Sequence, residues 1–202
     1  MPPRPRYTRE VLLDAAVALT RDQGIAAVSA RTLAATLGCS TAPIFTAFDN
    51  MDALNEALMD TLMARFAAAT EAEPGPDPLF AAGLGMVRFA AEQPRLYEAL
   101  FLTHHPWHFK WGRVRRSLAA RMAAHPRYAG LSDEARFGLI GRSSIIVHGL
   151  GVEVWSGRLT DTAPASLERL LNQLAGPLID ASIERGWTHD IHTPSPVRHG
   201  AP

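Results

Sequence analysis

The chain is poor in several features that define large classes of protein. Only one of its 202 residues is a cysteine, Cys39, so an internal disulfide is excluded. Its formal net charge is zero, so it lacks the overall basic charge of proteins that bind nucleic acid without specificity. Any contact with DNA must therefore be made by a local group of residues.

Long apolar runs and targeting signals are also missing. No stretch reaches the roughly 18 consecutive apolar residues that suggest a membrane span. The first residues show no charged segment followed by an apolar run and a cleavage site. We therefore expect a cytoplasmic protein that does not contact a membrane.

Catalytic motifs are absent as well. There is no nucleophile elbow, phosphate loop, metal triad or pair of catalytic carboxylates. His104 and His108 are one helical turn apart, but Pro106 between them breaks that geometry and no cysteine or carboxylate is close in sequence. We expect no enzyme, no metal site and no cofactor.

Helix formers and helix caps are abundant instead, and they predict an all-α fold. Apolar spacing, N-cap residues and stop signals together predict about nine helices. The expected helices cover Glu10 to Gln23, Ser29 to Leu37, Thr41 to Ala47, Met51 to about Ala69, Leu79 to Glu92, Arg95 to Leu102, Trp107 to Ala124, Ser132 to Trp155 and Pro164 to Arg185.

The stretch from Ser29 to Phe48 is the most informative in the chain. Ser29 is a good N-cap, Gly38 can end the first helix in the left-handed conformation, and Ser40 can cap a second helix. In that second helix Ile44 and Phe48 point inward, and the outer face is small and polar. This pattern predicts a helix-turn-helix, in which the short second helix enters the DNA major groove.

The clearest break in the chain is EAEPGPDP, residues 71–78, which holds three prolines and a glycine. The helix before it is long enough to leave one domain and enter the next. We therefore expect a DNA-binding domain with an N-terminal arm at residues 1–50, a ligand-binding and dimerisation domain at 51–187, and a disordered tail at 188–202.

The N-terminal residues resemble the TetR family of bacterial transcriptional regulators. The match consists of Leu12-Leu13-Asp14-Ala15-Ala16, Leu19, Gly24, Ser29-Ala30-Arg31-Thr32-Leu33-Ala34, Leu37-Gly38-Cys39-Ser40, Ile44-Phe45 and Phe48. The resemblance implies a nine-helix homodimer. Its three N-terminal helices bind operator DNA, the fourth is a link, and the rest bind a small molecule and form the dimer.

This chain departs from the family pattern on the side that faces DNA. The family usually has a glycine, a tyrosine and a histidine in the recognition helix and a lysine at the start of the fourth helix. This sequence has Ala42, Phe45, Ala47 and Met51 at those positions. The tyrosine hydroxyl and the lysine ordinarily contact phosphates, so their loss removes two positioning contacts per subunit.

The candidate DNA-binding residues are two arginines on the arm and an outward-facing set around the turn. For each threonine, a solvated helix position is the alternative, and the arm is alternatively a disordered terminus that carries charge. Few cations are involved, so we expect a weak dependence of DNA binding on salt. The set is Arg4, Arg6, Arg31, Thr32, Ser40, Thr41, Pro43, Phe45 and Thr46.

The candidate ligand-binding residues are aromatic or soft apolar side chains with one histidine, which suits a largely apolar effector. An ordinary place in the core is the alternative for each of them. His148 is either a polar group in the pocket or a buried histidine that bonds to a backbone carbonyl. The set is Met86, Phe89, Tyr97, Phe101, Trp107, Trp111, His148 and Trp155.

The last two long helices are expected to pair with their symmetry mates as a four-helix bundle, using Gly149, Gly151, Leu171, Leu174 and Leu178. The basic run from Arg113 to Arg121 is either a solvated helix face or a second anion site. The resulting prediction is a repressor that a small molecule releases from its operator. The alternatives are a helical ligand sensor that has lost or weakened DNA binding, and an enzyme.

Overall fold

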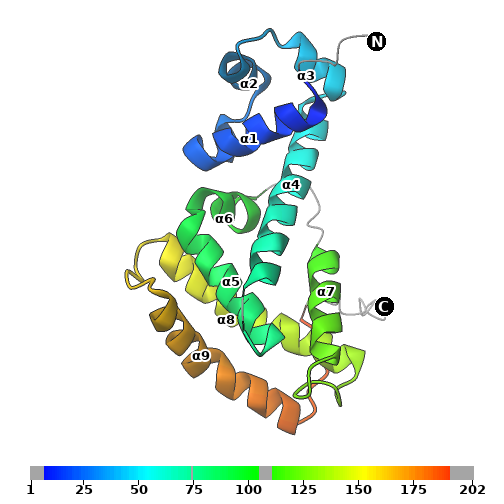
Figure 1. Ribbon diagram of the computed structural model, residues 1–202, viewed down its shortest axis with the longest axis vertical. Helices are drawn as coiled ribbons and strands as arrows, with labels where there is room; N and C mark the ends of the chain where they lie inside the picture. Colours follow the sequence, from blue (N-terminus) through cyan, green and yellow to red (C-terminus); the bar gives the residue numbers. More distant parts are fainter. Residues whose placement is uncertain (1–6, 74, 105–110, 192–202) are drawn as a thin grey trace, which may run out of the picture. The chain divides into compact units, whose positions relative to one another are not determined.

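The computed structural model describes residues 7–73, 75–104 and 111–191. These residues form α-helices and one short 3₁₀ turn, with no strand among them, as the all-α prediction requires (Figure 1). The elements are α1 (Arg9–Gln23), η1 (Ile25–Ala27), α2 (Ala30–Leu37), α3 (Ala42–Ala47), α4 (Met51–Ala72), α5 (Pro78–Glu92), α6 (Pro94–Phe101), α7 (Trp111–Ala123), α8 (Asp133–Trp155) and α9 (Pro164–Glu184).

The helix ends follow the signals read from the sequence. The Thr8 hydroxyl accepts a hydrogen bond from Val11 N at the start of α1, and Gly24 ends that helix at a φ of 87°. The Asn50 side chain accepts from Ala53 N in the first turn of α4, and the Ser132 hydroxyl accepts from Ala135 N in that of α8. Helix α4 continues to Ala72, beyond the expected end at Ala69.

The chain folds into two compact units. The N-terminal unit comprises residues 1–69 and 89–110, and the C-terminal unit comprises residues 70–88 and 111–202. The division runs through α4 and α5 and does not follow the sequence break at residues 71–78. The prediction of functional domains at 1–50 and 51–187 is a different division and stays a prediction.

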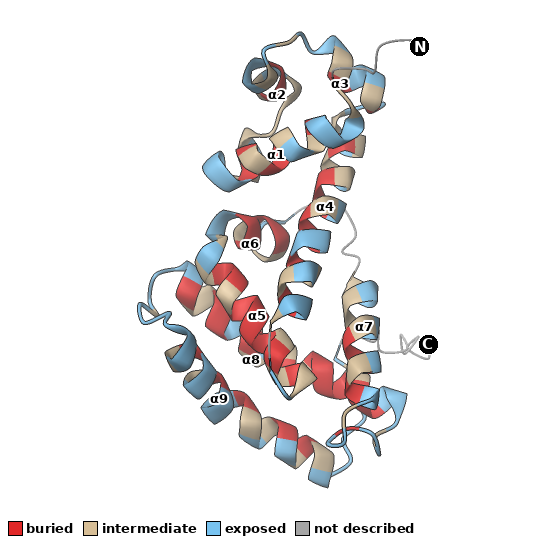
Figure 2. Cartoon of the chain, in the orientation of Figure 1, coloured by how far each residue is buried: buried red, intermediate tan, exposed pale blue. Residues whose placement is uncertain are grey.

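In the N-terminal unit, α1 packs against α2 and α6. Leu12 and Ala16 of α1, Leu33 of α2 and Ile44 of α3 are fully buried. Figure 2, in which buried residues are red, shows such residues along α1. Burial of a Leu or Ile side chain contributes roughly 1.5–3 kcal/mol. The inward residues of the helix-turn-helix therefore secure the position of α3.

A second part of the N-terminal unit is an aromatic cluster. The ring of Phe66 lies 5.4 Å from that of Phe89 and 5.1 Å from that of Phe101, both edge to face. The ring of Tyr97 lies 4.9 Å from that of Phe101. Edge-to-face pairs at such distances are favourable beyond their buried area, so the cluster joins α4, α5 and α6.

The C-terminal unit is built around α8, which packs against α7 and α9. Helix α5 approaches α8 and α9 closely at Gly83. A Cβ at that position would lie 3.1 Å from a methyl group of Val147 and 3.3 Å from one of Leu171. The absence of a side chain at Gly83 therefore allows this close packing of α5.

One helix in the described part of the chain, α8, is long and apolar enough to cross a membrane by length and mean hydropathy, although it contains no run of 18 consecutive apolar residues. Half of the apolar window is buried inside the C-terminal unit. A core helix of a globular domain passes the same test, and the packing of α8 on two neighbours fits that explanation.

Candidate DNA interface and ligand-binding unit

The turn between α2 and α3 is determined by local hydrogen bonds. Ser29 and Thr32 form a capping box, in which the Ser29 hydroxyl accepts from Thr32 N at 3.2 Å and the Thr32 hydroxyl accepts from Ser29 N at 3.0 Å. Gly38 ends α2 at a φ of 63°, a left-handed conformation that favours glycine. The sequence predicted the Ser29 cap and the helix end at Gly38. It did not predict that the Thr32 hydroxyl bonds back to Ser29 N.

Helix α3 begins one residue later than expected. Thr41, and not Ser40, occupies the N-cap position, and its side chain makes no capping hydrogen bond. Its backbone is already helical, and its carbonyl accepts from Ile44 N at 3.1 Å. Ser40 and Thr41 are both exposed, so their hydroxyls face solvent at the start of the helix.

The outer face of α3 is partly apolar. Phe45 is 49% exposed, although it follows the fully buried Ile44. Thr46 is exposed, but its hydroxyl donates to the carbonyl of Ala42 at 3.0 Å within the helix. Pro43 is half-buried. Phe45 is therefore the largest side chain that this short helix presents to solvent.

The candidate residues of α2 differ from each other in accessibility. Arg31 is exposed and has no ion pair within the described ranges, so its guanidinium is available to an outside partner. Thr32 is half-buried, and its hydroxyl donates to the carbonyl of Ala27 at 2.6 Å besides serving in the capping box. These contacts give the Thr32 hydroxyl a structural role, and the DNA contact predicted for this residue stays a prediction. Arg4 and Arg6 lie outside the described residues.

Arg9 is a residue that the sequence analysis missed. Its guanidinium donates to the carbonyl of Ala47, the last residue of α3, at 3.1 Å, and lies 4.2 Å from the ring centre of Phe48. These two contacts connect the start of α1 to the end of α3. Nothing in the local sequence indicates the pairing, because the partners are 38 residues apart.

The candidate ligand-binding residues fall into both units. Phe89, Tyr97 and Phe101 belong to the aromatic cluster of the N-terminal unit, where burial raises the pKa of Tyr97 far above its usual value. Met86, Trp111, His148 and Trp155 belong to the C-terminal unit. Trp107 lies outside the described residues. The set as a whole stays a prediction.

His148 lies on α8 and is half-buried. Burial lowers the pKa of its imidazole below the ordinary value. The side chain is therefore neutral at pH 7, which suits a site for an apolar molecule. Elsewhere in the described residues, no group of three or more potential metal ligands occurs, and His105 and His108 lie outside them.

The residues expected to form the dimer also differ in exposure. Leu171 and Gly151 are buried within the protomer, Leu178 is half-buried, and Gly149 and Leu174 are exposed. Two further apolar side chains on α8, Ile145 at 60% and Trp155, are also exposed. Each of Ile145, Gly149, Trp155 and Leu174 is therefore accessible to a partner. Leu171, in contrast, packs against α5 at Gly83.

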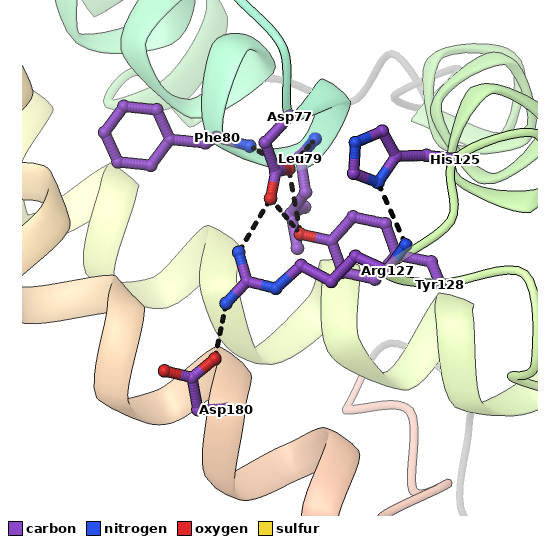
Figure 3. Close-up of polar contacts among 7 residues, drawn as sticks. All are labelled: Asp77, Leu79, Phe80, His125, Arg127, Tyr128 and Asp180. Atoms are coloured by element: carbon purple, nitrogen blue, oxygen red, sulfur yellow. Dashed lines mark hydrogen bonds and ion pairs between the residues drawn. The ribbon is translucent and has the colours of Figure 1, made fainter.

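A polar cluster in the C-terminal unit joins four segments, as Figure 3 shows. Asp77 accepts hydrogen bonds from Leu79 N and Phe80 N and so caps α5. The hydroxyl of the buried Tyr128 donates to the Asp77 carboxylate at 2.6 Å. The Arg127 guanidinium bonds to both Asp77 and Asp180 of α9. We call these four side chains, Asp77, Arg127, Tyr128 and Asp180, the Asp77 cluster.

The segment after α9 also has defined contacts, although we expected residues from 188 onward to be disordered. Arg142 of α8 donates to the carbonyls of Trp187 and His189, at 3.0 and 2.7 Å. Arg115 of α7 pairs with Asp190 at 2.7 Å. Residues 187–191 therefore lie against α7 and α8, and the rest of the expected tail, 192–202, is outside the described residues.

The first helices of the chain match a known protein family. A model of bacterial regulatory proteins of the tetR family matches residues 12–58, which run from the first turn of α1 into α4. The match covers the predicted helix-turn-helix and parts of the helices on either side of it, so this part of the chain is similar to the tetR family. No curated protein matches the sequence.

Solved structures of TetR regulators have a fold similar to that of this chain. A TetR variant of Acinetobacter baumannii in complex with minocycline is 18% identical with a TM-score of 0.59, and the alignment covers 87% of this chain and 96% of that one. A TetR family regulator of Marinobacter aquaeolei is 20% identical with a TM-score of 0.59, covering 86% and 94%.

A third structure aligns over almost the whole chain. SmeT, the repressor of the multidrug efflux pump SmeDEF in Stenotrophomonas maltophilia, is 21% identical with a TM-score of 0.51, and the alignment covers 98% of both chains. At such low identity the three likenesses establish a shared fold.

Proposed function

We propose that this protein is a cytoplasmic, homodimeric repressor of the TetR family that binds operator DNA through α2 and α3 and is released by a small molecule. The observation that carries the proposal is the exposure of Phe45 at 49% on a helix whose other face is fully buried. A large apolar side chain on the outside of a helix-turn-helix can contact a partner surface. The major groove offers one, because thymine methyl groups accept apolar contacts.

The remaining contacts are few and come from side chains that have no internal role. Arg31 and the hydroxyls of Ser40 and Thr41 are exposed, so they can bind phosphates or base edges. Each phosphate that a cation neutralises adds about 0.9 to the slope of log K against log salt. With so few cations, a dimer is expected to show a slope no steeper than about six.

The effector is expected to bind the helices after α4 and to favour one spacing of the two recognition helices over another. Minocycline in the A. baumannii relative is an example of such a ligand in this fold. The size of the response equals the difference in affinity of the effector for the two states. The half-buried, neutral His148 and the aromatic side chains support an effector that is largely apolar.

A ligand sensor with weakened DNA binding is the second candidate, and the composition of α3 favours it. Ala42 and Ala47 supply no polar group, and the Thr46 hydroxyl bonds to its own helix. Met51 stands where the family usually has a lysine. Among the described residues, each subunit then has only Arg31 and the hydroxyls of Ser40 and Thr41 as candidate polar contacts with DNA.

A mobility-shift assay on the DNA upstream of the protein's own gene separates the two candidates. A repressor gives a retarded band that competitor DNA of unrelated sequence does not remove and that some small molecule abolishes. A sensor without DNA binding gives no band with any upstream fragment at physiological salt. Arg31→Ala tests the contact list, and Arg113→Ala, an exposed arginine on α7, is the matched control.

The dimer is tested separately by sedimentation equilibrium. Leu174→Glu places a charge on the exposed apolar surface of α9 and is expected to shift the protein toward monomer. Asn172→Glu introduces the same charge at another exposed position of that helix and is expected to leave the mass unchanged. A monomeric wild-type protein contradicts the proposed dimer.

A further inference from the structure

The arginines of the basic run on α7 have different environments. Arg113 and Arg116 are exposed, as a solvated helix face requires. Arg115 bonds to Asp190 and to the carbonyl of Phe137. Arg121 is half-buried, and its Nε atom is buried with no hydrogen-bond partner in the described part of the chain. Arg121 is therefore a half-buried arginine of this run whose guanidinium has no hydrogen-bond acceptor within the described residues.

Arg121 lines a cavity of about 270 Å³ between the segment before α5 and the end of α7. His125 lies on the same wall, and Pro76, Pro78, Ala81 and Ala124 supply apolar surface. All of these residues belong to the C-terminal unit. The volume is slightly below the range of typical sites for drug-sized ligands, so it suits a molecule of modest size.

The acidic groups around this cavity already have cationic or hydroxyl partners. Glu73, which also lines it, accepts from Arg88 with both carboxylate oxygens at 3.0 Å. Asp77 bonds to Arg127 and Tyr128. No carboxylate of the described chain pairs with Arg121. The positive charge of Arg121 is thus uncompensated next to an apolar wall, where an unpaired charge is costly.

His125 adds a second donor. Its Nδ1 accepts from Arg127 N at 3.3 Å, as Figure 3 shows, and its ring stands 5.5 Å from that of Tyr128. Because Nδ1 acts as an acceptor, the neutral imidazole carries its proton on Nε2. The wall of the cavity therefore has a guanidinium and an imidazole N–H, which are both donors, beside a group of proline and alanine side chains.

We propose that this cavity is a binding site for a small monocarboxylate with an apolar body. The carboxylate bonds to the guanidinium of Arg121 and to Nε2–H of His125, and the body lies against Pro76, Pro78, Ala81 and Ala124. Planar carboxylates match the donor geometry of a guanidinium. The site differs from the predicted effector residues and does not depend on DNA binding.

The test uses isothermal titration calorimetry on the full chain without DNA, so its outcome is independent of the proposed repressor function. The probe is benzoate, and benzamide is its neutral counterpart. Benzoate is expected to bind saturably at one site per chain, and benzamide is expected not to bind measurably. Arg121→Gln is expected to weaken benzoate binding about 10-fold or more, the loss typical of a charge-assisted hydrogen bond.

Arg113→Gln is the matched control, because it removes the same charge from an exposed position of the same helix. It is expected to change the benzoate affinity by less than about twofold. If Arg121→Gln does not fold, Ala124→Leu replaces it. Ala124 is exposed, and a leucine there reduces the cavity while keeping the charge of Arg121.

Three results overturn the proposal. One is the absence of saturable benzoate binding to the wild-type chain. Another is an affinity unchanged in Arg121→Gln, or in Ala124→Leu where that variant is used. The third is inorganic phosphate binding more tightly than benzoate, which rejects the apolar part of the assignment.

Discussion

The helix-turn-helix segment and the Asp77 cluster are both polar-rich junctions between helices, but they are stabilised over different distances along the chain. In the segment from Ser29 to Phe48, the capping box joins residues three positions apart. In the Asp77 cluster, Tyr128 and Arg127 reach a carboxylate about 50 residues away. The first junction is therefore specified by neighbouring residues, and the second depends on the packing of the C-terminal unit.

The largest effect on stability is expected from Asp77→Ala. The change removes the cap of α5, leaves the buried Tyr128 hydroxyl without its acceptor, and removes one of two ion pairs of Arg127. We expect a loss of about 2–4 kcal/mol in the free energy of unfolding, measured by urea denaturation. Asp60→Ala does not touch the cluster and serves as a control, with a smaller loss. Equal losses contradict the special role of Asp77.

The same cluster gives a pH dependence with a defined sign. Burial acts to raise the pKa of Asp77, but hydrogen bonds from Tyr128, Arg127 and Phe80 N outweigh it, so the pKa lies below its ordinary value. A lowered pKa in the folded state stabilises the fold above the unfolded pKa of about 3.9, and this stability is lost as the pH falls further. The stability difference between wild type and Asp77→Asn is therefore expected to shrink below about pH 4.

A smaller loss is expected from Gly138→Ala on α8. A Cβ there would lie 2.7 Å from the backbone oxygens of Thr188 and His189, so the segment after α9 has to move. We expect a loss of about 1–3 kcal/mol in the free energy of unfolding and faster proteolysis after residue 186. Gly130→Ala, where nothing lies within 4 Å, is the control. An unchanged stability contradicts the docking of residues 187–191.

The smallest loss is expected from Ser29→Ala in the capping box. Removing an N-cap hydroxyl typically costs about 1 kcal/mol, and here it also removes a partner of Thr32. Thr36→Ala is a matched control, because its hydroxyl bonds only to the carbonyl of Thr32 one turn earlier. Thermal unfolding followed by circular dichroism measures both, and a larger loss in Thr36→Ala contradicts the role of the box.

The fold was predictable because its signals are local. Ser29 caps its helix as expected, Thr8 and Ser132 cap theirs in the same way, and Gly24 and Gly38 end theirs at positive φ. Helix existence depends on caps and apolar spacing within one segment, which are visible in the sequence. The start of α3 at Thr41 was less predictable, because two adjacent hydroxyl residues are equally suitable caps.

The functional sites were less predictable because their partners are distant in sequence. Thr32 is of a residue type that can contact DNA, but its hydroxyl donates to the carbonyls of Ala27 and Ser29. Arg9 contacts the end of α3, and Arg121 lies beside a cavity that begins at Glu73. Residue spacing along one helix does not show whether a side chain bonds within the protein or faces an outside partner. It also does not show that Arg121 lines a cavity and that Arg113 faces solvent.

The most direct test of the DNA-binding account is the affinity of wild type and Phe45→Ala for DNA from upstream of the protein's own gene, measured by fluorescence anisotropy. Because half of the Phe45 side chain faces solvent, Phe45→Ala is expected to fold normally and to bind about 10-fold more weakly. Equal affinities of the two proteins, or no binding by wild type, would contradict the account.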